Sequence, residues 1–470
     1  NSGMMRFLEF IVALIIVAVA AVVFGVLSPS SGHVERSVTV GKDLRQVYDV
    51  LDNMRRLPDY ATLRTDDRNI KFELSGKPFG PGAEISWTSN SLNVGNGSLT
   101  IVSADPKFDE VDDSTTNATI VWKLENDWRG NDKQFTLGMA RDGSRGQLTE
   151  LTVAYDVKYG WNLMDRFSNL YIHGKPDTFI QGALNNLQNV VAAIPNVDYS
   201  GLTPAIVPTK TQPVLMVSTS VPRSGGLEAI HDAIAAAVGL MQAEAKKLKI
   251  NIVGPRIVTT TNYGDQTYSF DVALPIDTNT LTLTKDGEPQ ELTPPTPPSL
   301  NAPTEPASDS SSPESAGSSA VADAAPVVGS RDARGRLVLG NGVLGELAFG
   351  DSTIALTAPW TGTFAGVATI RDQLRAYAQT HGYTFDVVVH PPYDIQTGAD
   401  VVGPQGDLIS HERYQIYLPL ESAPAQTPEQ EAGLVPEPAP ASTAAPAEAA
   451  PVAGNANGKK ANGKKGGAKK

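Results

Sequence analysis

The stretch VVGPQGDLISHERYQIYLPL, residues 401–420, echoes IVGPRIVTTTNYGDQTYSFDVALPI, residues 252–276. Each begins with valine-glycine-proline, continues with residues that alternate as in a strand, and ends with leucine-proline. A repeat at this distance indicates two related units, each too small to close a core alone. We therefore expect the two segments to be equivalent strands of two half-domains, residues 209–283 and 331–421.

The residues before each segment support this division. Residues 213–221 and 353–360 read as strands, and a helical pattern of apolar residues follows each of them. The first pattern consists of Leu227, Ile230, Ile234, Val238, Met241 and Leu248, and the second of Val367, Ile370, Leu374 and Tyr377. The second copy then carries an extra stretch, residues 383–400. Two units of strand-helix-strand-strand, a duplicated βαββ pattern, would pair about a pseudo-two-fold axis.

This duplicated unit resembles the GyrI-like domain, also called the bacterial transcription-factor effector-binding domain, over residues 212–420 apart from a linker. The resemblance implies a groove between the halves that binds small, often cationic or aromatic molecules through a glutamate and surrounding aromatic residues. The matching candidates are Glu412, Tyr414, Tyr417, Trp360 and Tyr393. Tyr268 stands opposite Glu412 in the repeat alignment, so the first copy lacks the acid and binding is expected to be asymmetric. No helical DNA-binding module accompanies the unit, so direct control of transcription is not expected.

Glu412 is the main candidate for a ligand contact. An acid rimmed by aromatic rings suits a cation through its charge and through the ring quadrupoles. Removing that charge would weaken binding of a cationic aromatic molecule by about 1–3 kcal/mol. The alternative is a carboxylate that protects an edge strand from aggregation. Some GyrI-like proteins are hydrolases that use such a glutamate, so an enzyme remains an alternative.

The first part of the chain, residues 33–200, predicts an α+β domain. A strand and a helix are followed by strand patterns from residue 70 to residue 159 and by one long amphipathic helix that ends near Pro195. This order, with VYDVLDNMRRLPDY, GPGAEISW and DTFIQGALNNLQNVV, resembles the START-like polyketide cyclase/dehydrase (SRPBCC) superfamily over residues 34–197. The resemblance implies a helix-grip fold, a curved antiparallel sheet around a long C-terminal helix. It also implies a cavity that holds lipids, polyketides or other apolar molecules.

Two tryptophans of this domain are candidates for the cavity wall. Trp87 and Trp122 lie on predicted strands, and ordinary core packing explains them equally well. No nucleophile, base and orienting group emerge together in the pattern, so catalysis in this domain is not expected.

Residues 1–32 predict a membrane anchor. Phe10 to Leu27 form an unbroken run of 18 apolar residues, which as a helix spans about 30 Å of hydrocarbon. A cleaved signal peptide is the alternative, although its apolar region is usually shorter. Arg6 favours a cytoplasmic N-terminus, while Arg36 and Lys42 on the other side argue against it. We expect a single-pass protein of the bacterial inner membrane with its folded domains in the periplasm.

Composition limits the remaining possibilities. Residues 284–330 and 422–470 are rich in small polar residues, proline and alanine, and predict disorder. The last thirteen residues hold six lysines and no acid, so the net charge of −13 becomes −19 without them. Such an acidic body argues against nucleic-acid binding by the folded domains. The chain has no cysteine, and its histidines lack metal-ligand spacing.

We also expect no cofactor. Gly340 to Gly345 match the glycine pattern of a dinucleotide-binding loop, but strand-like residues follow where a helix would be required, so we expect a turn. The sequence leaves the oligomeric state open. It favours a membrane-anchored binding protein with an apolar ligand in the START-like cavity and a small ligand, cationic and aromatic or simply hydrophobic, in the GyrI-like groove. The alternatives are a cyclase or hydrolase that acts on an apolar molecule, and an envelope adaptor.

Overall fold

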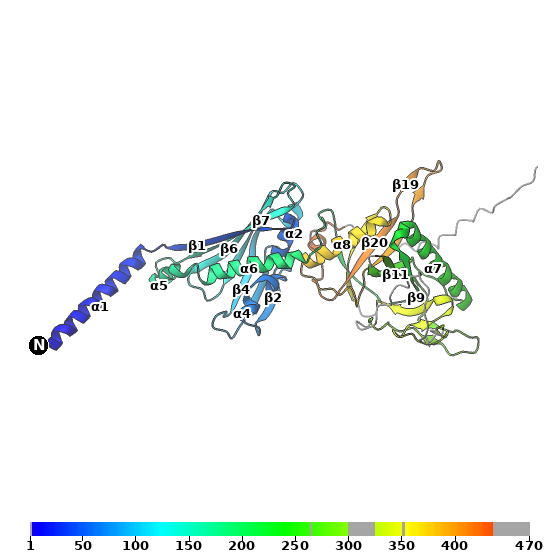
Figure 1. Ribbon diagram of the computed structural model, residues 1–470, viewed down its shortest axis with the longest axis horizontal. Helices are drawn as coiled ribbons and strands as arrows, with labels where there is room; N and C mark the ends of the chain where they lie inside the picture. Colours follow the sequence, from blue (N-terminus) through cyan, green and yellow to red (C-terminus); the bar gives the residue numbers. More distant parts are fainter. Residues whose placement is uncertain (1, 264–265, 299–324, 350–352, 436–470) are drawn as a thin grey trace, which may run out of the picture.

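A computed structural model of the chain describes residues 2–263, 266–298, 325–349 and 353–435. Helix α1 (Ser2–Leu27) extends from one end of an elongated molecule, and two domains follow it in chain order (Figure 1). Of the predicted linker and tail, residues 299–324 and 436–470 lie outside the described residues.

The first domain is built on a seven-stranded antiparallel sheet in the order β1-β7-β6-β5-β4-β3-β2. Its strands are β1 (Ser31–Val40), β2 (Lys71–Gly76), β3 (Ala83–Thr88), β4 (Gly97–Asp105), β5 (Asn117–Glu125), β6 (Asn131–Asp142) and β7 (Leu148–Lys158). The short helices between β1 and β2 are α2 (Leu44–Leu51), α3 (Leu57–Tyr60) and α4 (Leu63–Asp66). Buried and exposed residues alternate along β5, β6 and β7, so the sheet turns one apolar face inward.

The long helix α6 (Lys175–Ala192) covers that face, after α5 (Leu163–Phe167) and the short 3₁₀ helix η2 (Ser168–Tyr171). Ile180, Leu184 and Leu187 on one side of α6 are buried, because this stripe at helical spacing is the only apolar side that α6 offers to the sheet. The α+β helix-grip arrangement predicted for this part of the chain is the one observed.

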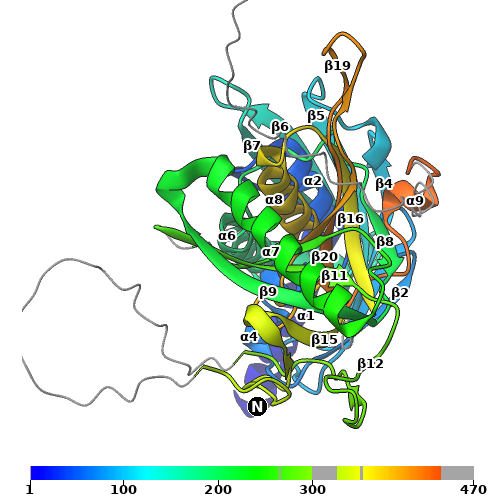
Figure 2. The same ribbon diagram turned by 90° about the vertical axis from the view of Figure 1, so that its right-hand side faces the viewer.

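The second domain contains a nine-stranded sheet in the order β14-β15-β9-β11-β10-β17-β20-β16-β8. Its strands are β8 (Ala205–Pro208), β9 (Gln212–Pro222), β10 (Ile257–Tyr263), β11 (Thr267–Pro275), β14 (Leu337–Val338), β15 (Leu344–Ala348), β16 (Ile354–Thr361), β17 (Tyr393–Gly398) and β20 (Arg413–Leu420). Helices α7 (Gly226–Leu248) and α8 (Ala365–Thr380) lie on the same side of this sheet (Figure 2). Two small hairpins accompany it, β12 (Thr280–Leu281) with β13 (Gln290–Glu291) and β18 (Val401–Val402) with β19 (Leu408–Ser410).

The sheet order contains two similar series of elements, β9-α7-β10-β11 and β16-α8-β17-β20, which meet where β10 pairs with β17. The register of the echoed segments differs from the sequence alignment. Residues 253–255 precede β10, whereas residues 402–404 belong to the β18–β19 hairpin between β17 and β20. The strand that occupies the place of β10 is therefore β17, which lies in the stretch interpreted as an insertion. A valine-glycine-proline tripeptide is too short to identify equivalent strands, because equivalence depends on pairing within the sheet.

The two domains share one apolar core, in which the C-terminal half of α8 packs against α2. Polar contacts reinforce this junction. The Asn53 side chain donates to the carbonyl of Thr380 over 3.0 Å, and the Tyr199 hydroxyl contacts both Asp49, at 2.8 Å, and Thr380, at 3.0 Å. Helix α8 is part of the second domain, and its C-terminal end is held by contacts with the first domain.

Two segments predicted to be disordered are partly folded. Strand β13 lies within residues 284–330, and the next residue, Leu292, is buried in the core of the second domain. In the predicted tail, helix α9 (Pro428–Glu431) packs on α8, where the Tyr377 hydroxyl donates to the buried Glu429. Composition failed here because a few apolar or cap-forming residues suffice to dock a short segment on an existing core. The glycine pattern from residue 340 forms a single 3₁₀ turn, η4 (Gly340–Gly342), followed by β15, as expected.

Candidate functional site

A cavity of about 210 Å³ lies between the N-terminal halves of α7 and α8, above β10 and β11. We call it the interhelical groove. Its lining consists of Leu227, Ile230, Val258, Thr260, Tyr268, Phe270, Phe364, Ala365, Val367, Ala368 and Arg371. Most of these side chains are apolar or aromatic, and the polar groups are two hydroxyls and one guanidinium. Small-molecule sites typically combine such walls with a few polar contacts.

The local sequence explains why these side chains meet. Val258 and Thr260 are two residues apart on β10, so both point to the side of the sheet that carries the helices. Tyr268 and Phe270 on β11 follow the same rule. Leu227 and Ile230 are three residues apart on α7 and share one face of that helix.

A buried ion pair forms part of the groove wall. The Arg371 guanidinium lies 3.1 Å from a carboxylate oxygen of Asp394 on β17, and only 7% and 2% of the two side chains are exposed. Burial raises the pKa of Asp394, and the charge and hydrogen bond of Arg371 oppose that rise. At the edge of the lining, the Arg223 guanidinium lies 5.0 Å from the centre of the Tyr268 ring. The wall therefore carries a compensated ion pair together with an aromatic ring that faces a cation.

Among the residues predicted for this site, Tyr268 lines the groove and three others lie beside it. The Tyr414 ring meets the groove residue Phe364 edge-on, with ring centres 5.8 Å apart. Trp360 is paired with Tyr414 across β16 and β20. Glu412, which is partly exposed, accepts a hydrogen bond of 2.5 Å from the Tyr414 hydroxyl. Glu412 is not one of the lining residues of the groove.

Tyr393 and Tyr417 lie on the opposite face of the sheet. Their rings stack on each other with centres 4.8 Å apart, and the Phe349 ring stacks on Tyr393 at 4.2 Å. Tyr414 and Tyr417 are an odd number of residues apart on one strand, so their side chains must point to opposite faces. The expectation that both rim one groove is therefore corrected.

Sequence reasoning missed most of the groove. Leu227, Ile230 and Val367 belong to apolar patterns that indicate a helix but no ligand site, and no sequence pattern marks Phe364 or Ala368. One signal was present, because Arg371 falls four residues after Val367, within the apolar stripe of its helix. A charge in that position indicates a buried ion pair, but its partner, Asp394, cannot be identified without the pairing of β17.

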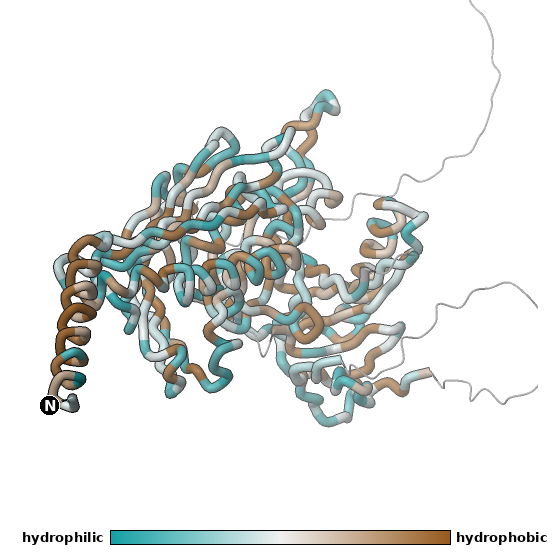
Figure 3. The backbone as a smooth tube through the Cα atoms, turned by 60° about the vertical axis from the view of Figure 1, so that its left-hand side comes forward, coloured by the Kyte–Doolittle hydropathy of each residue, from teal (hydrophilic) through white to brown (hydrophobic). Residues whose placement is uncertain are grey.

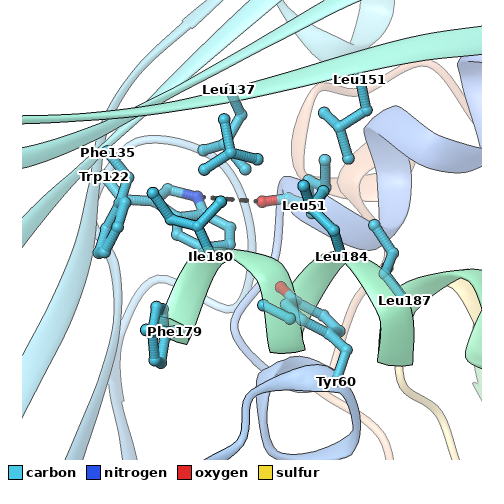
Figure 4. Close-up of a pocket in the computed structure, with 12 residues that line it drawn as sticks. Leu51, Tyr60, Trp122, Phe135, Leu137, Leu151, Phe179, Ile180, Leu184 and Leu187 are labelled. Atoms are coloured by element: carbon cyan, nitrogen blue, oxygen red, sulfur yellow. Dashed lines mark hydrogen bonds between the residues drawn. The ribbon is translucent and has the colours of Figure 1, made fainter. Parts of the chain in front are cut away.

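A second, much smaller cavity lies in the first domain between α6 and the sheet (Figure 4). Its volume is about 30 Å³, and its lining consists of Leu51, Tyr60, Trp122, Phe135, Leu137, Leu151, Val153, Phe179, Ile180, Ala183, Leu184 and Leu187. Trp122 is one of the lining residues, and its indole N–H donates to the carbonyl of Leu51 over 3.3 Å. Trp87 is a buried core residue that does not line it.

This volume matches about one water molecule and leaves no room for the lipid or polyketide that the family resemblance implied. Large side chains on both sides of the cavity account for the small space. Phe179 from α6 meets Phe135 from β6 with ring centres 5.5 Å apart. The Tyr60 hydroxyl in the wall has no hydrogen-bond partner within the described part of the chain, and the remaining wall is apolar, so the cavity offers too few polar partners to hold a water.

Comparison with known proteins gives fold similarity only. No protein-family model matches the sequence, and no curated protein matches it. Similar solved structures include XoxI from Bacillus cereus, with 13% identity over 34% of this chain and 96% of that chain and a TM-score of 0.24. Norcoclaurine synthase from Thalictrum flavum matches at 11% identity over 36% and 91% of the two chains, with a TM-score of 0.26. Identities and TM-scores this low indicate nothing about a ligand or an activity of this chain.

The described residues contain no cluster of three or more side chains suited to a metal ion. Helix α1 is the one described helix that is long and apolar enough to cross a membrane. The tube coloured by hydropathy shows hydrophobic residues along most of the length of α1 (Figure 3).

Proposed function

We propose that this protein is a membrane-anchored binding protein and that its interhelical groove holds a small aromatic molecule. The observation that supports this most directly is the groove itself, about 210 Å³ of space walled by apolar and aromatic side chains. An aromatic ligand would replace water against Phe270, Phe364 and Val258, and apolar burial yields about 25 cal/mol per Å². Its place between α7 and α8 agrees with the GyrI-like resemblance of residues 212–420.

In this proposal α1 crosses the bacterial inner membrane and the two domains face the periplasm. The length and composition of α1 support the crossing, and Arg6 before the apolar run supports the orientation. The contacts of α2 with α8 give the first domain a structural role, because they hold the ligand-binding domain in a fixed position relative to the anchor. This role combines the binding function with that of an envelope adaptor.

The polar groups of the groove determine which ligand fits. Thr260 and Tyr268 offer hydroxyls that donate or accept hydrogen bonds, and Arg371 adds positive charge that Asp394 compensates. A neutral aromatic molecule with one or two hydrogen-bonding groups satisfies this wall. A preference for cations would depend on Glu412, which does not line the groove. Its carboxylate accepts a hydrogen bond from Tyr414, and the Tyr414 ring contacts the groove residue Phe364.

A substitution that fills the groove tests the proposal. Ala368 lines the groove and is exposed. Ala368→Phe therefore places a ring in the empty space with little disturbance of the core. Ala236→Phe is the matched control, because Ala236 is an exposed alanine of α7 outside the lining. We expect Ala368→Phe to weaken binding of the neutral dye phenylnaphthylamine at least tenfold, and Ala236→Phe to leave it unchanged.

Fluorescence titration of the full-length protein in detergent, with a titration of protein-free micelles subtracted, measures both affinities, and thermal denaturation verifies that both variants fold. Equal dye binding by the parent and a folded Ala368→Phe variant would show that the groove is not the site. Proflavine, a cationic aromatic dye, and anilinonaphthalene sulfonate, an anionic relative of the neutral dye, then establish the charge preference.

A further inference from the structure

The end of the first domain next to α1 exposes a group of large apolar side chains. Trp161 is 82% exposed, Met164 62%, Leu170 62% and Tyr171 74%. They come from the turn before α5, from α5 itself and from η2, and we call them the α5 patch. Large apolar groups gathered on one surface usually mark an interaction site.

Helix α5 is attached to the last turn of α1. The rings of Phe24 and Phe167 stack with centres 5.7 Å apart. The guanidinium of Arg166 donates to the carbonyl of Val26 over 2.8 Å and to the carbonyl of Ser28 over 3.3 Å. These contacts satisfy carbonyls at the C-terminal end of α1, which lack partners within the helix. They also place α5 directly at that end, as Figure 1 shows.

The depth of this contact follows from helix geometry. The apolar run from Phe10 to Leu27 has 18 residues, or about 27 Å at 1.5 Å per residue, close to the hydrocarbon thickness of a bilayer. The contacts of α5 involve residues 24 to 28, at the end of that run. Helix α5 therefore lies at the boundary between the acyl chains and the lipid headgroups if α1 spans the membrane.

We propose that the α5 patch inserts into the interfacial layer of the same bilayer that α1 crosses. Tryptophan and tyrosine favour this layer because their rings are apolar and their N–H and O–H groups remain hydrated. The Arg166 guanidinium lies 4.7 Å from the centre of the Trp161 ring, so a cation lies at headgroup level beside the indole. Phe167, which lies within the segment that carries the patch, stacks on Phe24 of the exposed apolar helix α1, and this attachment to the anchor favours lipid over a separate protein partner.

This second contact has a mechanical consequence. A single helix leaves a domain free to tilt on the membrane, whereas a helix and a patch beside it define the orientation of the domain. The second domain shares a core with the first, so the interhelical groove would be held at a set orientation to the membrane. The proposal depends on the membrane-anchoring part of the proposed function and is independent of ligand binding in the groove.

Site-directed labelling tests the insertion, because the chain has no cysteine to remove. Met164→Cys and Leu170→Cys each receive an environment-sensitive nitrobenzoxadiazole dye in the full-length protein. Leu148→Cys is the control. Leu148 is the first residue of β7, and the other end of this strand, at Lys158, is the end nearest to α5. Each protein is reconstituted into phosphatidylcholine and phosphatidylglycerol vesicles, with and without lipid that carries a nitroxide high on the acyl chain.

We expect the nitroxide lipid to reduce the emission at positions 164 and 170 at least twofold and to leave the emission at position 148 unchanged. Vesicle flotation of the same samples measures anchoring separately. If the protein floats with the vesicles but neither patch label is quenched, the insertion is wrong while the anchor stands. Labels with blue-shifted emission that resist quenching would show that protein covers the patch. If the protein does not float, both the anchor and the insertion are wrong. Ligand binding in the groove is tested separately, by the dye titration of Ala368→Phe.

Discussion

Removing the positive charge of the buried ion pair in the groove wall should destabilise the second domain substantially. Arg371→Met keeps much of the volume of the side chain but removes the cation that is hydrogen-bonded to Asp394, and Arg256 then acts on Asp394 through its charge alone. The Asp394 side chain is 2% exposed, so water cannot replace the lost partner. Breaking a buried pair by removing one member typically costs about 3–5 kcal/mol, and we expect a loss of this size in the free energy of unfolding at pH 8.

The loss should depend on pH in a defined direction. Burial raises the pKa of Asp394, and Arg371 opposes that rise, so the variant should have a still higher Asp394 pKa in the folded state. A carboxyl group whose pKa is raised by folding destabilises the folded protein above that pKa. Its effect disappears as the pH falls towards the ordinary aspartate value. The variant should therefore recover part of its stability between pH 8 and pH 5.

Urea denaturation of the full-length protein in detergent, followed by tryptophan fluorescence at both pH values, measures the loss. The double variant Arg371→Met/Asp394→Leu removes both charges and should regain most of the lost stability. Lys123→Met breaks an ion pair whose side chains are 55% and 64% exposed and should leave stability unchanged. The reasoning would be refuted if Arg371→Met unfolded at pH 8 with a free energy within about 0.5 kcal/mol of that of the parent. This threshold is about a tenth of the usual cost of breaking a buried pair.

Three further predictions concern other parts of the chain. Burial raises the pKa of Glu429 to about 7, so this group alone should cost the parent about 3 kcal/mol of stability between pH 4.5 and 7, and Glu429→Gln should remove that share of the pH dependence. Glu412→Gln should change proflavine affinity less than twofold, because Glu412 lies outside the lining. A loss of tenfold or more by titration would instead support the direct contact expected from the sequence. Protein lacking residues 1–32 should stay in the supernatant after membrane sedimentation, whereas full-length protein in the supernatant at unchanged mass would contradict the anchor.

The fold of the first domain was predictable because its signals are local. Alternating residues on β5, β6 and β7 and the apolar stripe of α6 each indicate one element and its buried face. The size of its cavity was not predictable. Whether Phe179 and Phe135 enclose a ligand or fill the space themselves depends on how closely α6 approaches the sheet, which no periodic pattern records.

The groove was harder to predict than the elements around it. Helices α7 and α8 followed from their apolar spacing, but the pairing of β10 with β17 depends on contacts between residues more than a hundred positions apart. The valine-glycine-proline echo falls in residues 401–420, where β18 and β19 form a separate hairpin and only β20 belongs to the large sheet. Of the residues proposed for the groove, Tyr268 is the one that lines it. Tyr268 was identified by aligning the leucine-proline ends of β11 and β20.

Native mass spectrometry of the purified full-length protein, released from detergent, tests the central claim most directly, because it detects a bound small molecule of any identity by its mass. We expect the parent and Ala236→Phe to carry one small aromatic molecule per chain, and we expect Ala368→Phe to lack it. An adduct that persists in a folded Ala368→Phe variant would place the ligand outside the interhelical groove, and a parent without any adduct that also binds none of the three dyes would contradict the binding function.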